Sequence, residues 1–165
     1  MIVFEFARQK ESQAEHTYRI CAERADNIGL RTIFTMLANA EKRHLEVIKK
    51  MENEETANLV DGRLLRDAQS ILEQMRPLAD VFEAADSQVE LYREARESEE
   101  ASEDFYLAQS QITQNTHNQR LFLALAAEEH EHYLVLNSII EFASSPEARM
   151  ENAVFQPGAS VNTSQ

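Results

Sequence analysis

Two eleven-residue stretches, FTMLANAEKRH at positions 34–44 and FLALAAEEHEH at positions 122–132, carry one pattern in two distant parts of the chain. In each stretch, apolar residues follow one another at intervals of three or four and lead into the sequence Glu-x-x-His. This spacing places all of these side chains on one face of an α-helix. The pattern therefore predicts two helices that each present a carboxylate and an imidazole on the side that should face the core.

The two stretches belong to a longer internal repeat with an offset of 88 residues. The same offset aligns ESQAEHTY at 11–18 with EEASEDFY at 99–106, and ten positions between 11 and 47 are identical to their counterparts. The identical pairs include Glu11/Glu99, Tyr18/Tyr106, Asn27/Asn115, Glu41/Glu129 and His44/His132. Such self-similarity predicts two equivalent helical hairpins related by a pseudo-twofold axis.

Helical periodicity predicts four long helices, over the start of the chain to about residue 27, 30–54, about 86–115 and 116–144, with a shorter helix at 63–75 between the pairs. Gly29 is expected to stop the first helix. Capping boxes are expected at Ser87 with Glu90 and at Thr116 with Gln119.

The fold class is therefore all-α, with two antiparallel hairpins joined by a long crossover that contains the short helix. This is the connectivity of a ferritin-like four-helix bundle. We expect residues 1–145 to form this bundle. Residues 146–165 are expected to form a loosely held C-terminal tail, packed through Val154 and Phe155.

The composition excludes several classes of function. The 165 residues carry a formal net charge of −13, which argues against partners such as nucleic acid and anionic membranes. The longest apolar run, residues 121–127, is too short to span a bilayer, and the N-terminus does not resemble a signal peptide. A single cysteine, Cys21, allows neither an intrachain disulfide nor a cysteine-rich zinc site. We therefore expect a cytoplasmic location.

Carboxylates and imidazoles on the apolar faces of four different helices require a compensating cation, because an unpaired buried charge is very costly. Oxygen and imidazole ligands without thiolates favour iron, with manganese or a mixed pair as alternatives. One Glu from each of two helices and Glu-x-x-His from each of the other two is the ligand set of di-iron bundles. The expected metal ligands are Glu11, Glu41, His44, Glu99, Glu129 and His132.

Other polar residues lie near this set. Tyr18 and Tyr106 are expected either to pack in the core or to donate hydrogen bonds to ligand carboxylates. Glu15 and Glu103, one turn beyond Glu11 and Glu99, are further ligand candidates, with a solvent-facing position or hydrogen bonding to a ligand as the alternatives. Within residues 127–134 the repeat does not select Glu128, His130 or Glu131, which have no equivalents in the first hairpin.

With these motifs, residues 5–143 resemble the rubrerythrin-like branch of the ferritin-like superfamily. The resemblance implies two iron ions per chain, bridged by Glu41 and Glu129, with Glu11 and Glu99 as terminal ligands and both histidines as ligands. It also implies a homodimer. Relatives of this kind reduce hydrogen peroxide, or oxidise ferrous iron with peroxide or dioxygen.

Two departures from the family pattern stand out. The chain lacks the four cysteines of a rubredoxin domain, so we expect the electron donor to be a separate protein such as a rubredoxin. Ser102 occupies the position of an additional glutamate, three residues beyond Glu99. Three alternatives stay open: an iron-oxidising storage protein, a hydroxylase of an organic substrate, and a non-catalytic helical interaction module.

Overall fold

The computed structural model describes residues 2–59, 62–79, 82 and 84–144. These residues form five α-helices, α1 (Ile2–Arg24), α2 (Ile28–Glu52), α3 (Leu64–Met75), α4 (Asp86–Ile112) and α5 (Thr116–Ala143), with a short 3₁₀ helix, η1 (Arg76–Leu78). The predicted all-α class and the ferritin-like bundle are confirmed. The predicted tail, with Val154 and Phe155, lies outside the described residues.

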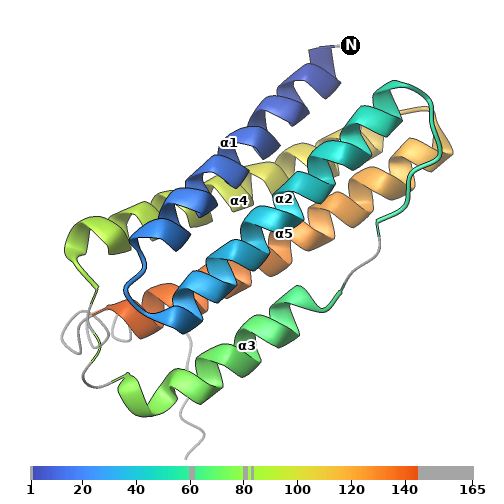
Figure 1. Ribbon diagram of the computed structural model, residues 1–165. Coiled ribbons are helices and arrows are strands. Elements are labelled where there is room, and N and C mark those ends of the chain that lie inside the picture. Colours follow the sequence, from blue (N-terminus) through green and yellow to red (C-terminus); the bar gives the residue numbers. More distant parts are fainter. Residues whose placement is uncertain (1, 60–61, 80–81, 83, 145–165) are drawn as a thin grey trace, which may run out of the picture.

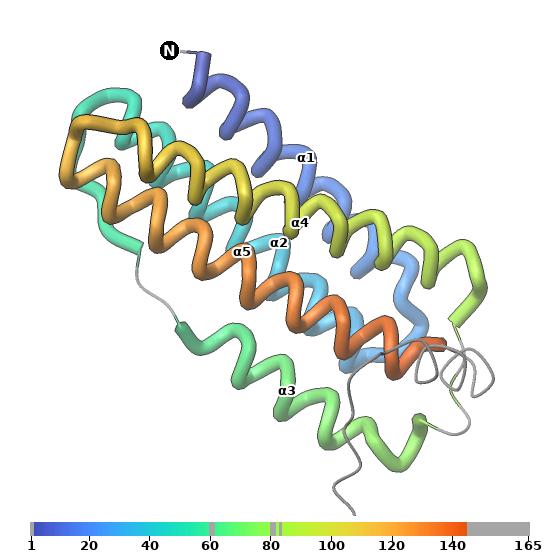
Figure 2. Tube along the Cα trace, turned by 180° about the vertical axis from the view of Figure 1, so that it is seen from behind, coloured from blue at the N-terminus to red at the C-terminus, as the bar shows by residue number. Residues whose placement is uncertain are grey.

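The bundle consists of two antiparallel hairpins, α1 with α2 and α4 with α5, packed side by side (Figure 1). The crossover from α2 to α4 runs back along the outside of the bundle. Its helix α3 packs against α5 and α2, as the view from behind also shows (Figure 2). Within the described parts of the chain, none of the helices combines the length and the apolar character needed to cross a bilayer.

Both hairpin turns use an asparagine to cap the second helix. The side-chain Oδ1 of Asn27 accepts hydrogen bonds from the N–H groups of Gly29 and Leu30 at 2.7 and 3.2 Å. Asn115, its counterpart in the repeat, accepts from His117 and Asn118 at 2.9 and 3.1 Å. These bonds satisfy amide groups that have no partner inside the helix.

The predicted helix ends were wrong in three places. Gly29 does not stop the first helix but lies in the first turn of α2, because Asn27 caps that helix. Thr116 does not cap α5, since Asn115 one residue earlier takes that role. Ser87 lies inside α4, which begins at Asp86 without a side-chain cap.

Gly29 has a packing role instead of a terminating one. A Cβ atom at this position would collide with the Met75 side chain of α3 and would lie 3.1 Å from Ile71. The absence of a side chain therefore lets α3 approach the start of α2 closely.

The apolar core is divided into two clusters. One surrounds Phe34 and Tyr92, and the other surrounds Phe122 and Tyr106 at the opposite end of the bundle. A layer of buried acidic and imidazole side chains lies between them. The fold thus surrounds a polar centre with apolar side chains along the bundle axis.

Candidate metal centre

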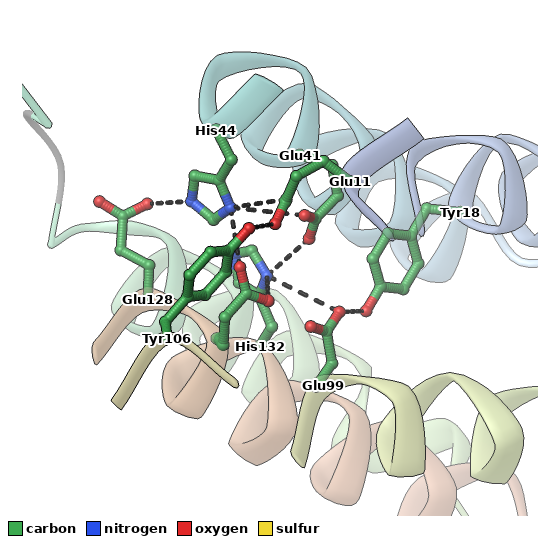
Figure 3. A network of polar contacts seen from close by, with 9 residues as sticks. Glu11, Tyr18, Glu41, His44, Glu99, Tyr106, Glu128 and His132 are labelled. Atoms are coloured by element: carbon green, nitrogen blue, oxygen red, sulfur yellow. Dashed lines mark hydrogen bonds and ion pairs between the residues drawn. The ribbon is translucent and has the colours of Figure 1, made fainter. Parts of the chain in front are cut away.

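Six titratable side chains from four helices meet in the middle of the bundle (Figure 3). Each is at most 2% exposed. The helices α2 and α5 each contribute a Glu-x-x-His pair, because residues three apart share one helix face. The helices α1 and α4 each contribute one glutamate. The six residues are those predicted from the repeat: Glu11, Glu41, His44, Glu99, Glu129 and His132.

These side chains form two groups that overlap. Glu11 and His44 lie in the first group, Glu99 and His132 lie in the second, and Glu41 and Glu129 belong to both. Within each group, one potential ligand atom from every residue lies within 4.8 Å of the others. Two adjacent four-ligand groups that share two carboxylates have the geometry of a dinuclear metal site with bridging glutamates.

The distances identify which imidazole nitrogen faces the centre. His44 Nδ1 lies 2.9 Å from Glu129 Oε1 and 3.2 Å from Glu11 Oε2. His132 Nδ1 lies 2.7 Å from Glu41 Oε1 and 3.7 Å from Glu129 Oε2. Both rings therefore present Nδ1 to the shared carboxylates.

Several buried atoms in this centre make no well-aligned hydrogen bond, although an imidazole or carboxylate partner lies 2.7–3.4 Å from each of them. They are both carboxylate oxygens of Glu41, Oε1 of Glu129 and Nδ1 of His132. Buried polar atoms normally make well-aligned hydrogen bonds, so this arrangement of carboxylate and imidazole atoms is unusual for a protein core. All four are good metal-ligand atoms. The three oxygens belong to Glu41 and Glu129, which both groups share, and the nitrogen belongs to His132 of the second group. The donor set therefore fits a pair of divalent or trivalent cations.

The electrostatics of the carboxylates support the same conclusion. Burial raises the pKa of Glu129 to about 7, and the charges of Glu41 and Glu11 add to that effect. Burial also raises the pKa values of Glu41 and Glu99 well above the usual range. Burial also acts to raise the pKa of Glu11, but the hydrogen bond and the charge of His44 outweigh burial, so the pKa of Glu11 is lowered. Without cations, the centre strongly disfavours full ionisation of its carboxylates.

The two imidazoles differ in their titration. Burial alone would lower the pKa of His44, but Glu129, Glu11 and Glu128 stabilise its cationic form, and its pKa is raised. The pKa of His132 is lowered, chiefly by burial. The repeat thus gives the two histidines equivalent positions but different surroundings.

Both predicted tyrosines donate hydrogen bonds to carboxylates across the bundle. The Tyr18 hydroxyl donates to Glu99, and the Tyr106 hydroxyl donates to Glu11. Burial raises the pKa of both phenols, so the hydroxyls remain protonated donors. Each tyrosine thereby orients the glutamate that belongs to only one of the two groups.

Glu128 was not predicted as part of this centre. Its Oε2 accepts a hydrogen bond from His44 Nε2 at 2.8 Å, on the side of the ring opposite the shared carboxylates. A carboxylate at this position fixes the orientation of a metal-binding imidazole. The repeat missed Glu128 because its counterpart is Ala40. Its spacing of three residues from Leu125 and four from His132 places it at the edge of the inward face, and this spacing could have revealed it.

The other candidates lie outside the two groups. Glu15 accepts a hydrogen bond from Arg19 at 3.1 Å. Glu103 lies 3.0 Å from His130 on the exposed side of the second hairpin. Ser102 is buried on α4.

Comparison with known protein families agrees with the geometry. The family model described as Rubrerythrin matches residues 3–139. The chain belongs to the rubrerythrin family. This confirms the resemblance and identifies the protein with a family of di-iron, oxidoreductase-type proteins. No curated protein and no solved structure matches this rubrerythrin-family chain.

Proposed function

We propose that this protein is a non-haem di-iron oxidoreductase that reduces hydrogen peroxide or dioxygen, acting as a peroxidase or ferroxidase. The observation that carries the proposal is the pair of overlapping buried groups that share Glu41 and Glu129. Family membership supports iron as the metal, and the oxygen and imidazole donors also suit manganese or a mixed pair.

In this proposal the six side chains hold two ions. Glu11 and His44 would bind one ion, Glu99 and His132 would bind the other, and Glu41 and Glu129 would be shared by both. When bound, two ferrous ions supply the two electrons that, with two protons, convert one hydrogen peroxide into two water molecules.

The rest of the centre holds this arrangement in place. Tyr18 and Tyr106 keep Glu99 and Glu11 oriented by hydrogen bonds and provide protonated hydroxyls beside the ligands. Glu128 fixes the ring of His44. The apolar clusters on both sides restrict water, which strengthens electrostatic interactions in the centre.

We also propose a homodimer that receives electrons from a separate protein such as a rubredoxin. The only cysteine of the chain, Cys21, is buried and belongs to the apolar core, so it offers no cysteine-ligated electron-transfer centre.

Metal content after anaerobic Fe²⁺ loading and desalting tests the proposal. We expect two irons per chain in the wild type, a clear loss in Glu129→Ala, and no loss in Glu15→Ala, which removes a glutamate outside both groups. Stopped-flow oxidation by peroxide and by dioxygen then identifies the preferred oxidant. A wild-type protein that retains no iron would contradict the proposal and favour a helical interaction module.

A further inference from the structure

A cavity of about 170 Å³ lies between α1 and α4 and ends at the candidate metal centre. Buried Tyr18, Glu99 and Ala95 form its inner end. Exposed Glu94 and Ser98 lie at its outer end, on the surface of α4. The cavity therefore runs from solvent to the hydrogen bond between Tyr18 and Glu99, which Figure 3 shows beside His132.

The pseudo-symmetric position beside Glu11 carries larger side chains. Under the 88-residue offset, Thr17 of the cavity corresponds to Phe105, and Glu94 corresponds to Phe6. The rings of Phe6 and Phe105 pack against each other with their centroids 5.0 Å apart. Lys10, which corresponds to Ser98, lies over the Phe6 ring at 5.7 Å. Two large rings in contact and a long side chain thus stand where the cavity is lined by Thr17, Glu94 and Ser98, and the Phe6 ring remains 47% exposed.

We propose that small, uncharged, hydrogen-bonding molecules such as hydrogen peroxide enter the metal centre through the cavity beside Glu99, and that Phe6 and Phe105 close the equivalent route beside Glu11. This inference rests on the proposed function, since it names the oxidant class that the same centre admits.

Size permits this class of molecule, and polarity favours it. A cavity needs only about 10–15 Å³ to hold one water molecule, so this cavity has room for several molecules of the size of water or hydrogen peroxide. The hydroxyls of Thr17 and Ser98 offer hydrogen bonds along the walls. The Glu94 carboxylate at the outer end disfavours anions.

The test places two phenylalanines in the cavity beside Glu99, at the positions that correspond to Phe105 and Phe6. The double variant Thr17→Phe/Glu94→Phe fills the cavity, and Thr17→Val/Glu94→Gln is the matched control that removes the Thr17 hydroxyl and the Glu94 charge without filling it. A third variant, Phe105→Thr/Phe6→Glu, opens the other side. Circular dichroism melts and metal content establish that each variant folds and binds metal.

Two readouts then measure access. In Mn²⁺-loaded protein, relaxation of water protons reports how readily water reaches the ions, without any turnover. In Fe²⁺-loaded protein, stopped-flow absorbance reports the rate of oxidation by hydrogen peroxide. With unchanged metal content, we expect the filled variant to lose relaxation enhancement and to react roughly tenfold more slowly or worse, because entry then requires local opening of packed rings. The Val/Gln control should behave as wild type.

The outcomes separate the two proposals. Unchanged relaxation and unchanged oxidation in the filled variant would overturn the route. The Phe105→Thr/Phe6→Glu variant should show stronger relaxation and faster oxidation, and unchanged signals there would show that these rings do not close a second route. Weaker relaxation in the filled variant, in a protein whose wild type reacts with neither peroxide nor dioxygen, would support the route and contradict the proposed function. If Thr17→Phe/Glu94→Phe does not fold, Ser98→Leu fills the outer end and is judged by the same two readouts.

Discussion

Replacing Glu129 with glutamine should stabilise the metal-free protein and destabilise the metal-loaded one. Burial raises the pKa of Glu129 from 4.5 to about 7 in the folded protein. When folding raises the pKa of a carboxyl, the protein loses stability as the pH rises from the pKa of the unfolded chain to the pKa of the folded protein. The neutral amide of Glu129→Gln avoids this loss, and the side-chain shape is nearly unchanged.

The size of the effect follows from the two pKa values. Each pH unit between the two pKa values corresponds to 1.36 kcal/mol, so the rise from 4.5 to about 7 means that ionising Glu129 in the folded apo-protein costs about 3 kcal/mol. For a chain of this length, that corresponds to a rise of roughly 6–12 °C in the melting temperature. The full gain is expected at pH 8, and it should be almost gone at about pH 4.5, where the carboxyl is protonated in the folded protein and half protonated in the unfolded chain.

Thermal melts of chelator-treated protein between pH 4.5 and pH 8 measure this gain. The exposed substitution Glu100→Gln on α4 is the control and should change little at any pH. Repeating the melts with Fe²⁺ should reverse the order, because the wild type gains stability from bound metal and Glu129→Gln loses a shared ligand. A pH-independent difference, or a destabilised apo-variant at pH 8, would refute the electrostatic reasoning.

Three further predictions concern other parts of the molecule. Glu128→Ala should weaken metal binding about 10–100-fold in a chelator competition, because His44 loses the carboxylate that orients its ring; equal affinity would show that the ring is held by packing alone. Burial raises the pKa of Cys21 to about 12, so iodoacetamide at pH 8 should modify it only after unfolding, and rapid labelling of the native protein would contradict its buried position. Gly29→Ala should lower the melting temperature and increase hydrogen exchange in α3, because the new Cβ displaces Met75; unchanged exchange would mean that α3 adjusts without loss.

Much of the fold could be predicted because its determinants are local. Spacings of three and four residues reveal helices and their inward faces wherever packing is regular. The 88-residue repeat added the pairing of hairpins and distinguished Glu129 from its acidic neighbours. Helix starts were less predictable, since Thr116 and Asn115 are adjacent cap candidates and only backbone geometry decides between them.

By itself, the sequence determined the all-helical bundle and the six side chains that gather at its centre, because periodicity and repetition are properties of the chain alone. Only the tertiary structure decided what differs between the two halves. Glu128 on α5 contacts His44 on α2, whereas Ala40, the counterpart of Glu128 in the repeat, has no carboxylate to contact His132. Phe6 and Phe105 meet from two helices, while Glu94 and Thr17 leave a cavity. A repeat identifies what the halves share, whereas these asymmetric contacts depend on distances between helices that no spacing along the chain specifies.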